Sequence, residues 1–136
     1  MPDFVPTDRE LEALKILWRK GPCPVSDICE ELRKQGSDLA YTTVLSLLQV
    51  MEQKGLVGHQ KGGKAYSYFA RVERNSTFSA LTGGFLRKVF DGALDEYLAH
   101  ALNSKTPTSE ELDRLTQAIA EARHRAGRRS KGEKGP

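Results

Sequence analysis

The stretch from Ala40 to Ala70 constrains the fold of this chain more than any other, because it combines one helix, one helix stop and one hairpin. Apolar side chains at positions 44, 47, 48 and 51 follow the i, i+3, i+4, i+7 spacing of a single helical stripe. Gly55 after Lys54 is the pairing expected where a helix ends in a left-handed residue. Two strand-like runs, 56–60 and 65–69, then flank the turn Lys61-Gly62-Gly63-Lys64. This order predicts a winged helix-turn-helix, which makes double-stranded DNA the leading partner.

The residues ahead of that stretch predict two further helices. Thr7-Asp8-Arg9-Glu10 fits a capping box at the start of the first helix, which stops near Gly21. A second helix opens at Pro24 and ends near Gly36, and a very short strand is expected near Cys23. The side chains predicted to face inward are Leu11, Leu14, Leu17, Trp18, Val25, Ile28 and Leu32.

Beyond Ala70 the sequence changes to helical stripes without strand-like runs. One helix is broken at Asp91-Gly92, a second runs to about Asn103, and a last one is capped by Thr108 or Ser109. Three such helices in about 50 residues cannot easily bury their apolar stripes alone. We expect them to pack against a second copy, as a homodimer, with folding back onto the N-terminal helices as the alternative. The predicted dimerisation residues are Phe85, Val89, Leu94, Tyr97, Leu98, Leu102, Leu112, Leu115 and Ile119.

The predicted fold class is therefore mainly α with a small β-hairpin. A winged helix-turn-helix domain is expected at 6–71 and a helical dimerisation domain at 73–125. Residues 126–136 are Gly-rich, basic and devoid of large apolar side chains, and are expected to form a disordered basic tail. Six basic residues and one acidic residue from 123 onward give a local charge of +5, which leaves −2 for residues 1–122 out of the total of +3. Between 55 and 70, however, Lys61 and Lys64 stand without any acid and with His59 beside them. Such a local basic patch on a nearly neutral body suits a protein that binds phosphate at one place.

Composition excludes several other classes of protein. No apolar run approaches the ~20 residues of a membrane helix, and the N-terminus lacks the pattern of a secretory signal, so we expect a cytoplasmic protein without membrane insertion. Cys23 and Cys29 have no second Cys or His pair at zinc spacing, and are expected to be small buried thiols rather than metal or redox groups. The scattered histidines His59, His100 and His124 form no catalytic grouping, so no enzyme and no cofactor are expected.

The helix that begins near Tyr41 is the predicted reading element. Its N-terminal and exposed side chains would meet base edges in a major groove, where threonine methyls suit thymine methyls and a glutamine suits adenine. The alternative for Thr42 and Thr43 is that one of them caps the helix. The lysines of the wing are placed to neutralise flanking phosphates, unless they only form a solvated turn. The predicted DNA-binding residues are Tyr41, Thr42, Thr43, Ser46, Gln49, Lys61 and Lys64.

Four segments resemble the penicillinase repressor family (BlaI/MecI/CopY type), over roughly residues 6–125. They are LEALKILWRKGPCPVSDICEEL (11–32), YTTVLSLLQVMEQKGLV (41–57), GGKAYSYFA (62–70) and FLRKVFDGALDEYL (85–98). The resemblance implies a homodimeric transcriptional repressor that binds an inverted-repeat operator through the winged helix and dimerises through the C-terminal helices. It aligns Thr42, Thr43 and Ser46 with positions that face the groove, and Lys64 with the basic wing position.

Three departures bear on what the resemblance implies. The penicillinase repressors are inactivated by cleavage of an Asn-Phe bond, and His100-Ala101 stands at that place here, which puts cleavage by a membrane sensor protease in doubt. No cysteine follows Cys29, so a copper-binding cysteine hook is ruled out. Val50 stands where relatives commonly carry arginine. The rival hypothesis for the winged helix is a protein–protein adaptor that does not bind DNA.

Overall fold

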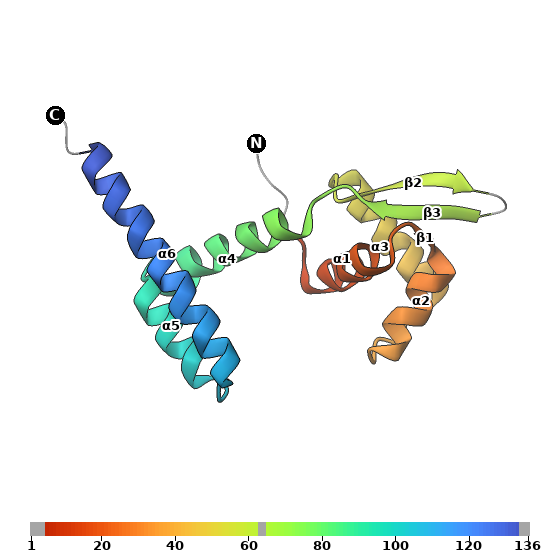
Figure 1. Cartoon of the computed structure of the whole chain (residues 1–136). Coiled ribbons are helices and arrows are strands. Elements are labelled where there is room, and N and C mark those ends of the chain that lie inside the picture. Colours follow the sequence, from red (N-terminus) through yellow and green to blue (C-terminus); the bar gives the residue numbers. More distant parts are fainter. Residues whose placement is uncertain (1–4, 63–64, 134–136) are drawn as a thin grey trace. The chain divides into compact units, whose positions relative to one another are not determined.

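The computed structural model describes residues 5–62 and 65–133. Along this part of the chain the order of elements is helix, strand, two helices, two strands and three helices (Figure 1). Their bounds are α1 Asp8–Lys20, β1 Cys23–Pro24, α2 Val25–Lys34, α3 Tyr41–Gln53, β2 Val57–Gly62, β3 Ala65–Ala70, α4 Arg74–Phe90, α5 Leu94–Asn103 and α6 Ser109–Glu133. The prediction of a mainly helical fold with a winged helix-turn-helix is confirmed, as is the short strand at Cys23. None of the described helices is long and apolar enough to cross a lipid bilayer.

The first helix starts where the capping box predicted. The Thr7 hydroxyl oxygen accepts a hydrogen bond from the Glu10 amide at 3.2 Å, and a Glu10 carboxylate oxygen accepts one from the Thr7 amide at 2.9 Å. A second capping box opens α6, where Thr108 and Glu111 exchange the same two bonds at 3.0 Å each. These reciprocal bonds satisfy amides that a helix start leaves unpaired.

Helix α3 passes into the hairpin through a tight stop at Gly55. The Gly55 amide donates to the Glu52 carbonyl at 3.0 Å and the Leu56 amide donates to the Met51 carbonyl at 2.9 Å. Gly55 has φ +84°, a conformation that a side chain would strain. Met51 and Leu56 are both buried, so this Schellman motif also sets the packing of α3 against the strand that follows.

The sheet has three antiparallel strands in the order β1-β3-β2. The register pairs His59 with Tyr68 and Lys61 with Tyr66, and β1 joins the far edge of β3 through Cys23 and Tyr68. Strand β2 is longer than the sequence suggested: Lys61 and Gly62 continue the ladder to Ala65 and do not belong to the turn. The two residues between the strands, Gly63 and Lys64, lie outside the described residues.

One apolar core holds α1, α2, α3 and the sheet together. Its fully buried large side chains come from all three helices and from β2: Leu14, Ile16, Ile28, Leu32, Val44, Leu48, Met51 and Val57. Burying a side chain of this kind contributes about 1.5–3 kcal/mol, so this cluster supplies most of the driving force for folding the N-terminal region. Cys23 lies in the core as predicted, whereas Cys29 is only partly buried. Burial raises the pKa of both thiols.

The chain divides into two compact units, residues 1–88 and 89–136, so the division falls later than the boundary near residue 72 predicted from the sequence. The start of α4 packs with the first unit because Trp18 reaches it. The Trp18 indole N–H donates to the Val72 carbonyl at 2.9 Å, and the Trp18 ring meets Phe78 edge to face at 5.8 Å. Arg74 covers the Phe78 ring with its guanidinium carbon 4.5 Å from the ring centre.

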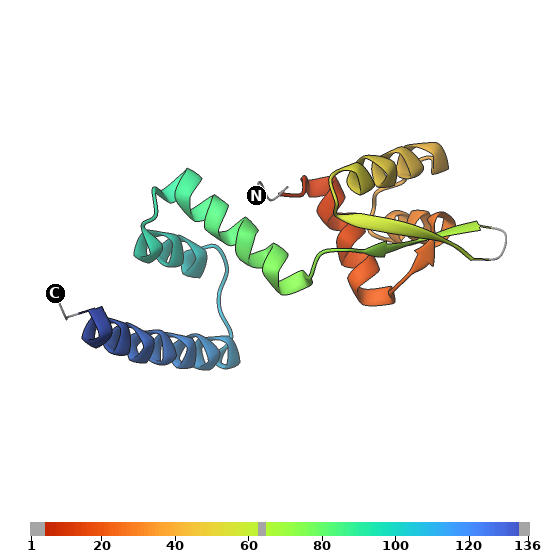
Figure 2. The ribbon, with the colours of Figure 1, turned by 90° about the horizontal axis from the view of Figure 1, so that it is seen from above.

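The second unit exposes apolar side chains. Helix α5 has no buried residue, and α4 breaks at Asp91-Gly92, which both have positive φ. Figure 2 shows α6 as a straight helix joined to α5 by the connection after Asn103. Large apolar side chains that remain exposed there and in the last turns of α4 are Phe85, Val89, Leu94, Leu102, Leu112 and Ile119, all predicted dimerisation residues, while Tyr97, Leu98 and Leu115 are partly buried.

Helix α6 contradicts one prediction about the C-terminus. The sequence suggested a disordered tail from Ala126, but α6 continues to Glu133. Arginine and lysine are good helix formers, and positive charge near a helix C-terminus interacts favourably with the helix dipole. These effects offset Gly127, which costs about 1 kcal/mol relative to alanine. Residues 134–136 lie outside the described part of the chain.

Candidate nucleic-acid interface

Helix α3 has one buried and one exposed face. Val44, Leu48 and Met51 are fully buried, which fixes the rotation of the helix about its axis. A half-turn away, a continuous exposed face carries short polar side chains and one apolar residue. Its members are Thr42, Thr43, Ser46, Gln49, Val50 and Gln53. Four of the five predicted α3 residues therefore lie on this exposed face. Tyr41 is also exposed, but it lies in the first turn, in line with buried Leu48.

The N-terminus of α3 lacks the cap that the sequence suggested. The N-cap is Ala40, no side chain bonds the first amides, and no acidic residue stands in the first turn. The expectation that Thr42 or Thr43 caps the helix is wrong, because both lie inside the helix rather than before it. A bare helix start carries unpaired N–H groups and about half a positive charge, which favours an anion such as phosphate. By contrast, α1, α5 and α6 all carry acidic residues in their first turns.

The hairpin presents a second set of residues next to α3. Lys61 is exposed on β2 opposite Tyr66, which is half exposed on β3. Because paired residues of an antiparallel ladder share a face, Lys61, Tyr66, His59 and Tyr68 all lie on one side of the hairpin. Lys64, the other predicted wing residue, lies outside the described residues.

Glu52 and His59 join α3 to the wing. The Nδ1 atom of His59 lies 2.8 and 2.9 Å from the two carboxylate oxygens of Glu52. The His59 ring also packs against Tyr66 at 4.9 Å and Tyr68 at 5.6 Å between ring centres. Tyr68 is buried, and burial together with the negative charge of Glu52 raises its pKa. The sequence grouped His59 with the wing lysines as part of a basic patch, but the structure pairs it with an acid.

A second ion pair joins the end of α3 to the start of α1. The Lys54 Nζ lies 2.7 Å from a carboxylate oxygen of Glu10, which is only 3% exposed. Burial by itself would raise the pKa of Glu10, but hydrogen bonds from Lys54 and the Thr7 backbone hold that pKa below its ordinary value. The same carboxylate thus caps α1 and anchors the last turn of α3.

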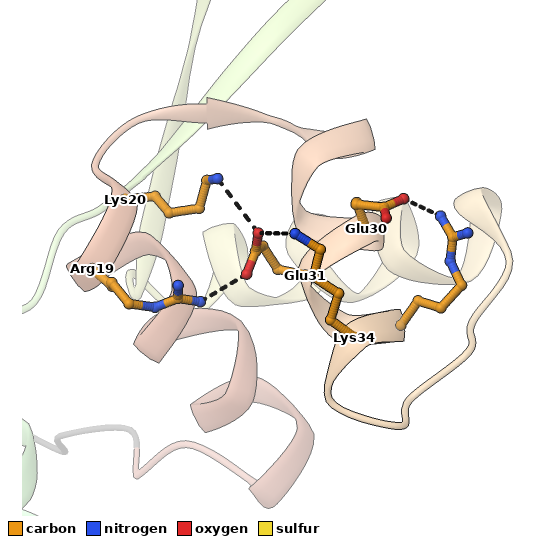
Figure 3. A network of polar contacts seen from close by, with 6 residues as sticks. Arg19, Lys20, Glu30, Glu31 and Lys34 are labelled. Carbon is orange, nitrogen blue, oxygen red and sulfur yellow. Dashed lines mark hydrogen bonds and ion pairs between the residues drawn. The ribbon is translucent and has the colours of Figure 1, made fainter.

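The cations at the ends of α1 and α2 bind acids of the protein itself. Figure 3 shows the Glu31 carboxylate surrounded by Arg19 at 3.0 Å and by Lys20 and Lys34 at 3.5 Å each. The Arg19 hydrogen bond and the neighbouring lysines lower the pKa of Glu31. Arg33 pairs with Glu30 on the same helix. This network links α1 to α2. Its positive charges are partly neutralised by Glu30 and Glu31, so they are less available to a ligand.

Three features of this surface were not predicted as site residues. The Glu52–His59 bond and the Glu10–Lys54 pair join positions that only the folded chain brings together. Tyr66 was recognised only as part of a Tyr-x-Tyr pattern in the second strand. Side chains two residues apart in a strand point to the same face, so Tyr66 and Tyr68 share one face of β3 and His59 and Lys61 share one face of β2. This alternation was the sequence signal that could have placed the four residues together.

Comparison with known proteins shows which family this chain belongs to. The sequence matches the family described as Penicillinase repressor over residues 6–121. The chain belongs to the penicillinase repressor family. The family match covers both the winged helix and most of the C-terminal helices, and the resemblance inferred from the sequence is confirmed.

Individual members of this family share modest identity with the chain. The protein is 24% identical over 119 residues to a "Penicillinase repressor" of Bacillus licheniformis, covering 88% of this chain and 92% of that protein. It is 31% identical over 116 residues to a "Transcriptional regulator BlaI" of Mycobacterium tuberculosis, covering 84% and 82%. Among solved structures, the DNA-binding domain of the repressor BlaI is 25% identical, with a TM-score of 0.46, over 54% of this chain and 90% of that one. A MarR family protein from Bacillus stearothermophilus gives 18% identity and a TM-score of 0.49, over 91% and 77%.

Proposed function

We propose that this protein is a DNA-binding transcriptional repressor that acts in the cytoplasm as a homodimer on an inverted-repeat operator. The observation that carries the proposal is the exposed face of α3, which is polar, begins at a helix start without a cap and lies beside the wing. A relative of this chain in the same family is named as a penicillinase repressor, and another as a transcriptional regulator.

Base reading falls to the exposed side chains of α3. Thr42, Thr43 and Ser46 offer hydroxyls and methyl groups near the helix start, the part of a recognition helix that contacts base edges. Gln49 can form two hydrogen bonds with an adenine in the major groove. Tyr41 stands at the edge of the helix start, where its hydroxyl suits a phosphate.

Phosphate binding falls to the bare start of α3 and to the wing. Lys61 carries an exposed positive charge on the face of the hairpin that also carries the Glu52–His59 bond. That bond fixes the wing base against α3, so the wing and the helix approach DNA as one body. Lys64 adds a second wing cation by its position in the sequence. Such contacts set the register of the protein without reading sequence.

The proposal of a homodimer is supported by exposed apolar side chains in the last turns of α4 and in the second unit. Six large apolar residues between Phe85 and Ile119 are at least 40% exposed in the single chain. A groove between α5 and α6 is lined by Leu98, Leu102 and Leu115, among others. Large apolar side chains exposed in this number favour a surface that another chain covers. A two-fold dimer would present two α3 helices to two half-sites, which is why an inverted repeat is the expected operator.

A separate proposal, which comes from the family resemblance, is that a membrane sensor protease cleaves the protein and so releases it from DNA. His100 and Ala101 are exposed but lie within α5, and the His100 ring contacts Phe90 at 5.5 Å between centres. Cleavage of that bond therefore requires α5 to unwind locally. Incubating the protein with the sensor protease encoded near its gene, if one is present, and looking for a fragment pair tests this step; an uncut chain would contradict it.

A mobility-shift titration with the promoter region of the gene's own operon tests the main proposal. The expected result is salt-sensitive, sequence-selective retardation, with two chains per retarded duplex. Gln49→Ala should weaken binding to the operator more than to a scrambled duplex, and Lys15→Ala, an exposed change on α1, serves as the matched control. Absence of retardation at low salt would favour a protein–protein adaptor instead.

A further inference from the structure

The last turns of α6 form a surface that the proposed function has not used. Arg123, Arg125 and Arg128 are all exposed there, with His124 among them. No acid lies between Glu121 and Glu133, and the three arginines make no ion pair among the side chains that the structure describes. We call these three arginines the basic end of α6. The penicillinase repressor match stops at residue 121, so this segment lies beyond it.

The charges at the ends of α1 and α2 behave differently. Arg19, Lys20 and Lys34 converge on Glu31, and Figure 3 shows their ammonium and guanidinium groups directed at its carboxylate. These cations already have partners within the fold. At the basic end of α6 the neighbouring acid is Glu121, which accepts a hydrogen bond from Gln117 at 3.2 Å and makes no ion pair with these arginines among the described side chains. Residues 1–122 carry a net charge of −2 against the +3 of the whole chain. Three of the four arginines whose side chains the structure describes on α6 therefore lie at this end of the helix, without an ion pair among the described residues.

Helical geometry separates most of this charge from the apolar stripe of α6. Leu112, Leu115 and Ile119 recur at intervals of three and four, and Ala122 and Ala126 continue the same line. At 100° per residue, Arg128 falls on the opposite side of the helix from that line, while Arg125 lies about 100° and Arg123 about 60° away from its centre. If a second copy covers the apolar stripe, Arg125 and Arg128 still face solvent.

We propose that the basic end of α6 binds phosphates of double-stranded DNA as a contact separate from the winged helix. The inference rests on the proposed function, since it takes the same duplex as its ligand. Arg123 to Arg128 spans about 7.5 Å of helix, and consecutive phosphates of one strand rise ~3.4 Å, so the segment matches two or three phosphates. Guanidinium groups suit this role because they bond phosphate oxygens in pairs. The contact adds affinity for any sequence and carries no base specificity.

Salt titration of the full chain tests this contact. The triple variant Arg123→Gln, Arg125→Gln, Arg128→Gln removes charge but keeps residues that favour helix. The slope of log affinity against log salt on a random duplex should fall by about 2–3, because each neutralised phosphate contributes ~0.9 to that slope. The operator-to-random affinity ratio should stay the same. The matched control, Arg123→Lys, Arg125→Lys, Arg128→Lys, should keep the wild-type slope.

An unchanged slope in the triple glutamine variant, with helix content and dimerisation intact by circular dichroism and sedimentation, would overturn the inference and leave the repressor proposal standing. In that case the basic end would serve an acidic protein surface or none. Conversely, if the wild-type chain binds the operator and the random duplex equally and the slope still falls in the variant, the phosphate contact holds and the sequence-specific repressor fails.

Discussion

Lys54 and Glu10 form an ion pair that joins the last turn of the candidate recognition helix to the first turn of α1. Their Nζ and Oε2 atoms lie 2.7 Å apart across 44 residues of sequence. Glu10 is almost completely buried, and its other carboxylate oxygen accepts the hydrogen bond from the Thr7 amide. A buried carboxylate of α1 therefore helps to fix the orientation of α3 and of its exposed face.

Changing Glu10→Gln should lower the free energy of unfolding by about 1–3 kcal/mol, the cost of leaving a buried polar partner unsatisfied. Glutamine still serves at this position of a capping box, so the change isolates the ion pair from the cap. Urea unfolding at pH 7 measures the difference. Glu12→Gln is the control and should cost less than about 0.5 kcal/mol, because it removes an exposed ion pair with Arg9 and leaves an amide oxygen that can still accept from the Ser37 hydroxyl. Equal losses in the two variants would show that burial of the pair does not matter.

Stability should decline in acid through Glu31. Its folded pKa is lowered by Arg19 and the neighbouring lysines, so the ionised form is preferred in the folded state. A lowered folded pKa means that the stabilisation is present above the ordinary value of about 4.3 and is lost as pH falls below it. Thermal melts between pH 7 and pH 3 should therefore fall less steeply for Glu31→Gln than for the wild type. Parallel curves would remove Glu31 from the acid response.

The wing should contribute charge but not sequence selectivity. Replacing both Lys61 and Lys64 by alanine should reduce the slope of log affinity against log salt by about 1.8, or ~0.9 for each phosphate. Affinity for the operator and for a random duplex should fall by the same factor, since phosphates carry no sequence information. Lys105→Ala, which breaks an exposed pair with Glu111 on the second unit, is the control. A slope equal to that of the wild type would take the wing out of the interface.

Val50 is the apolar residue on the exposed face of α3. It is 45% exposed on the face that carries Ser46 and Gln49, and its methyl groups suit the methyl of thymine. Replacing operator thymines by uracil one at a time should weaken wild-type binding roughly fourfold at one position, from ~0.8 kcal/mol for a buried methyl group. Val50→Ala should abolish that difference at the same position. If uracil has the same effect on both proteins, Val50 does not touch a thymine.

A charge in the apolar stripe of α6 should separate the two chains. Ile119 is 51% exposed in the single chain, so Ile119→Glu should leave the N-terminal unit folded while placing a charge in a dimer interface. Sedimentation should shift from dimer to monomer, and operator affinity should fall at least tenfold because two half-sites are no longer bound together. Gln117→Glu, on the opposite side of the same helix, should change neither. A variant that stays dimeric would place the interface elsewhere.

Features that depend on neighbouring residues could be predicted from the sequence. The Thr7–Glu10 capping box, the Gly55 stop and the apolar stripe through Val44, Leu48 and Met51 all formed where spacing predicted them, because each depends on residues within one or two helical turns. The prediction of a cap at Thr42 or Thr43 was wrong, since several residues there can begin a helix and only packing decides which one does. The same uncertainty affected the end of α6, where good helix formers outweighed glycine.

The sequence by itself determined which face of each helix is apolar and where the hairpin lies, since these follow from short-range periodicity. It also carried the four segments that resemble the penicillinase repressor family, which the family match then confirmed. Tertiary structure alone decided which charges remain available. His59 turned out to bind Glu52, Lys54 to bind Glu10, and three cations to share Glu31. Coulombic attraction and hydrogen bonding fall off steeply with distance, so such pairings depend on packing that brings separate segments within about 3 Å.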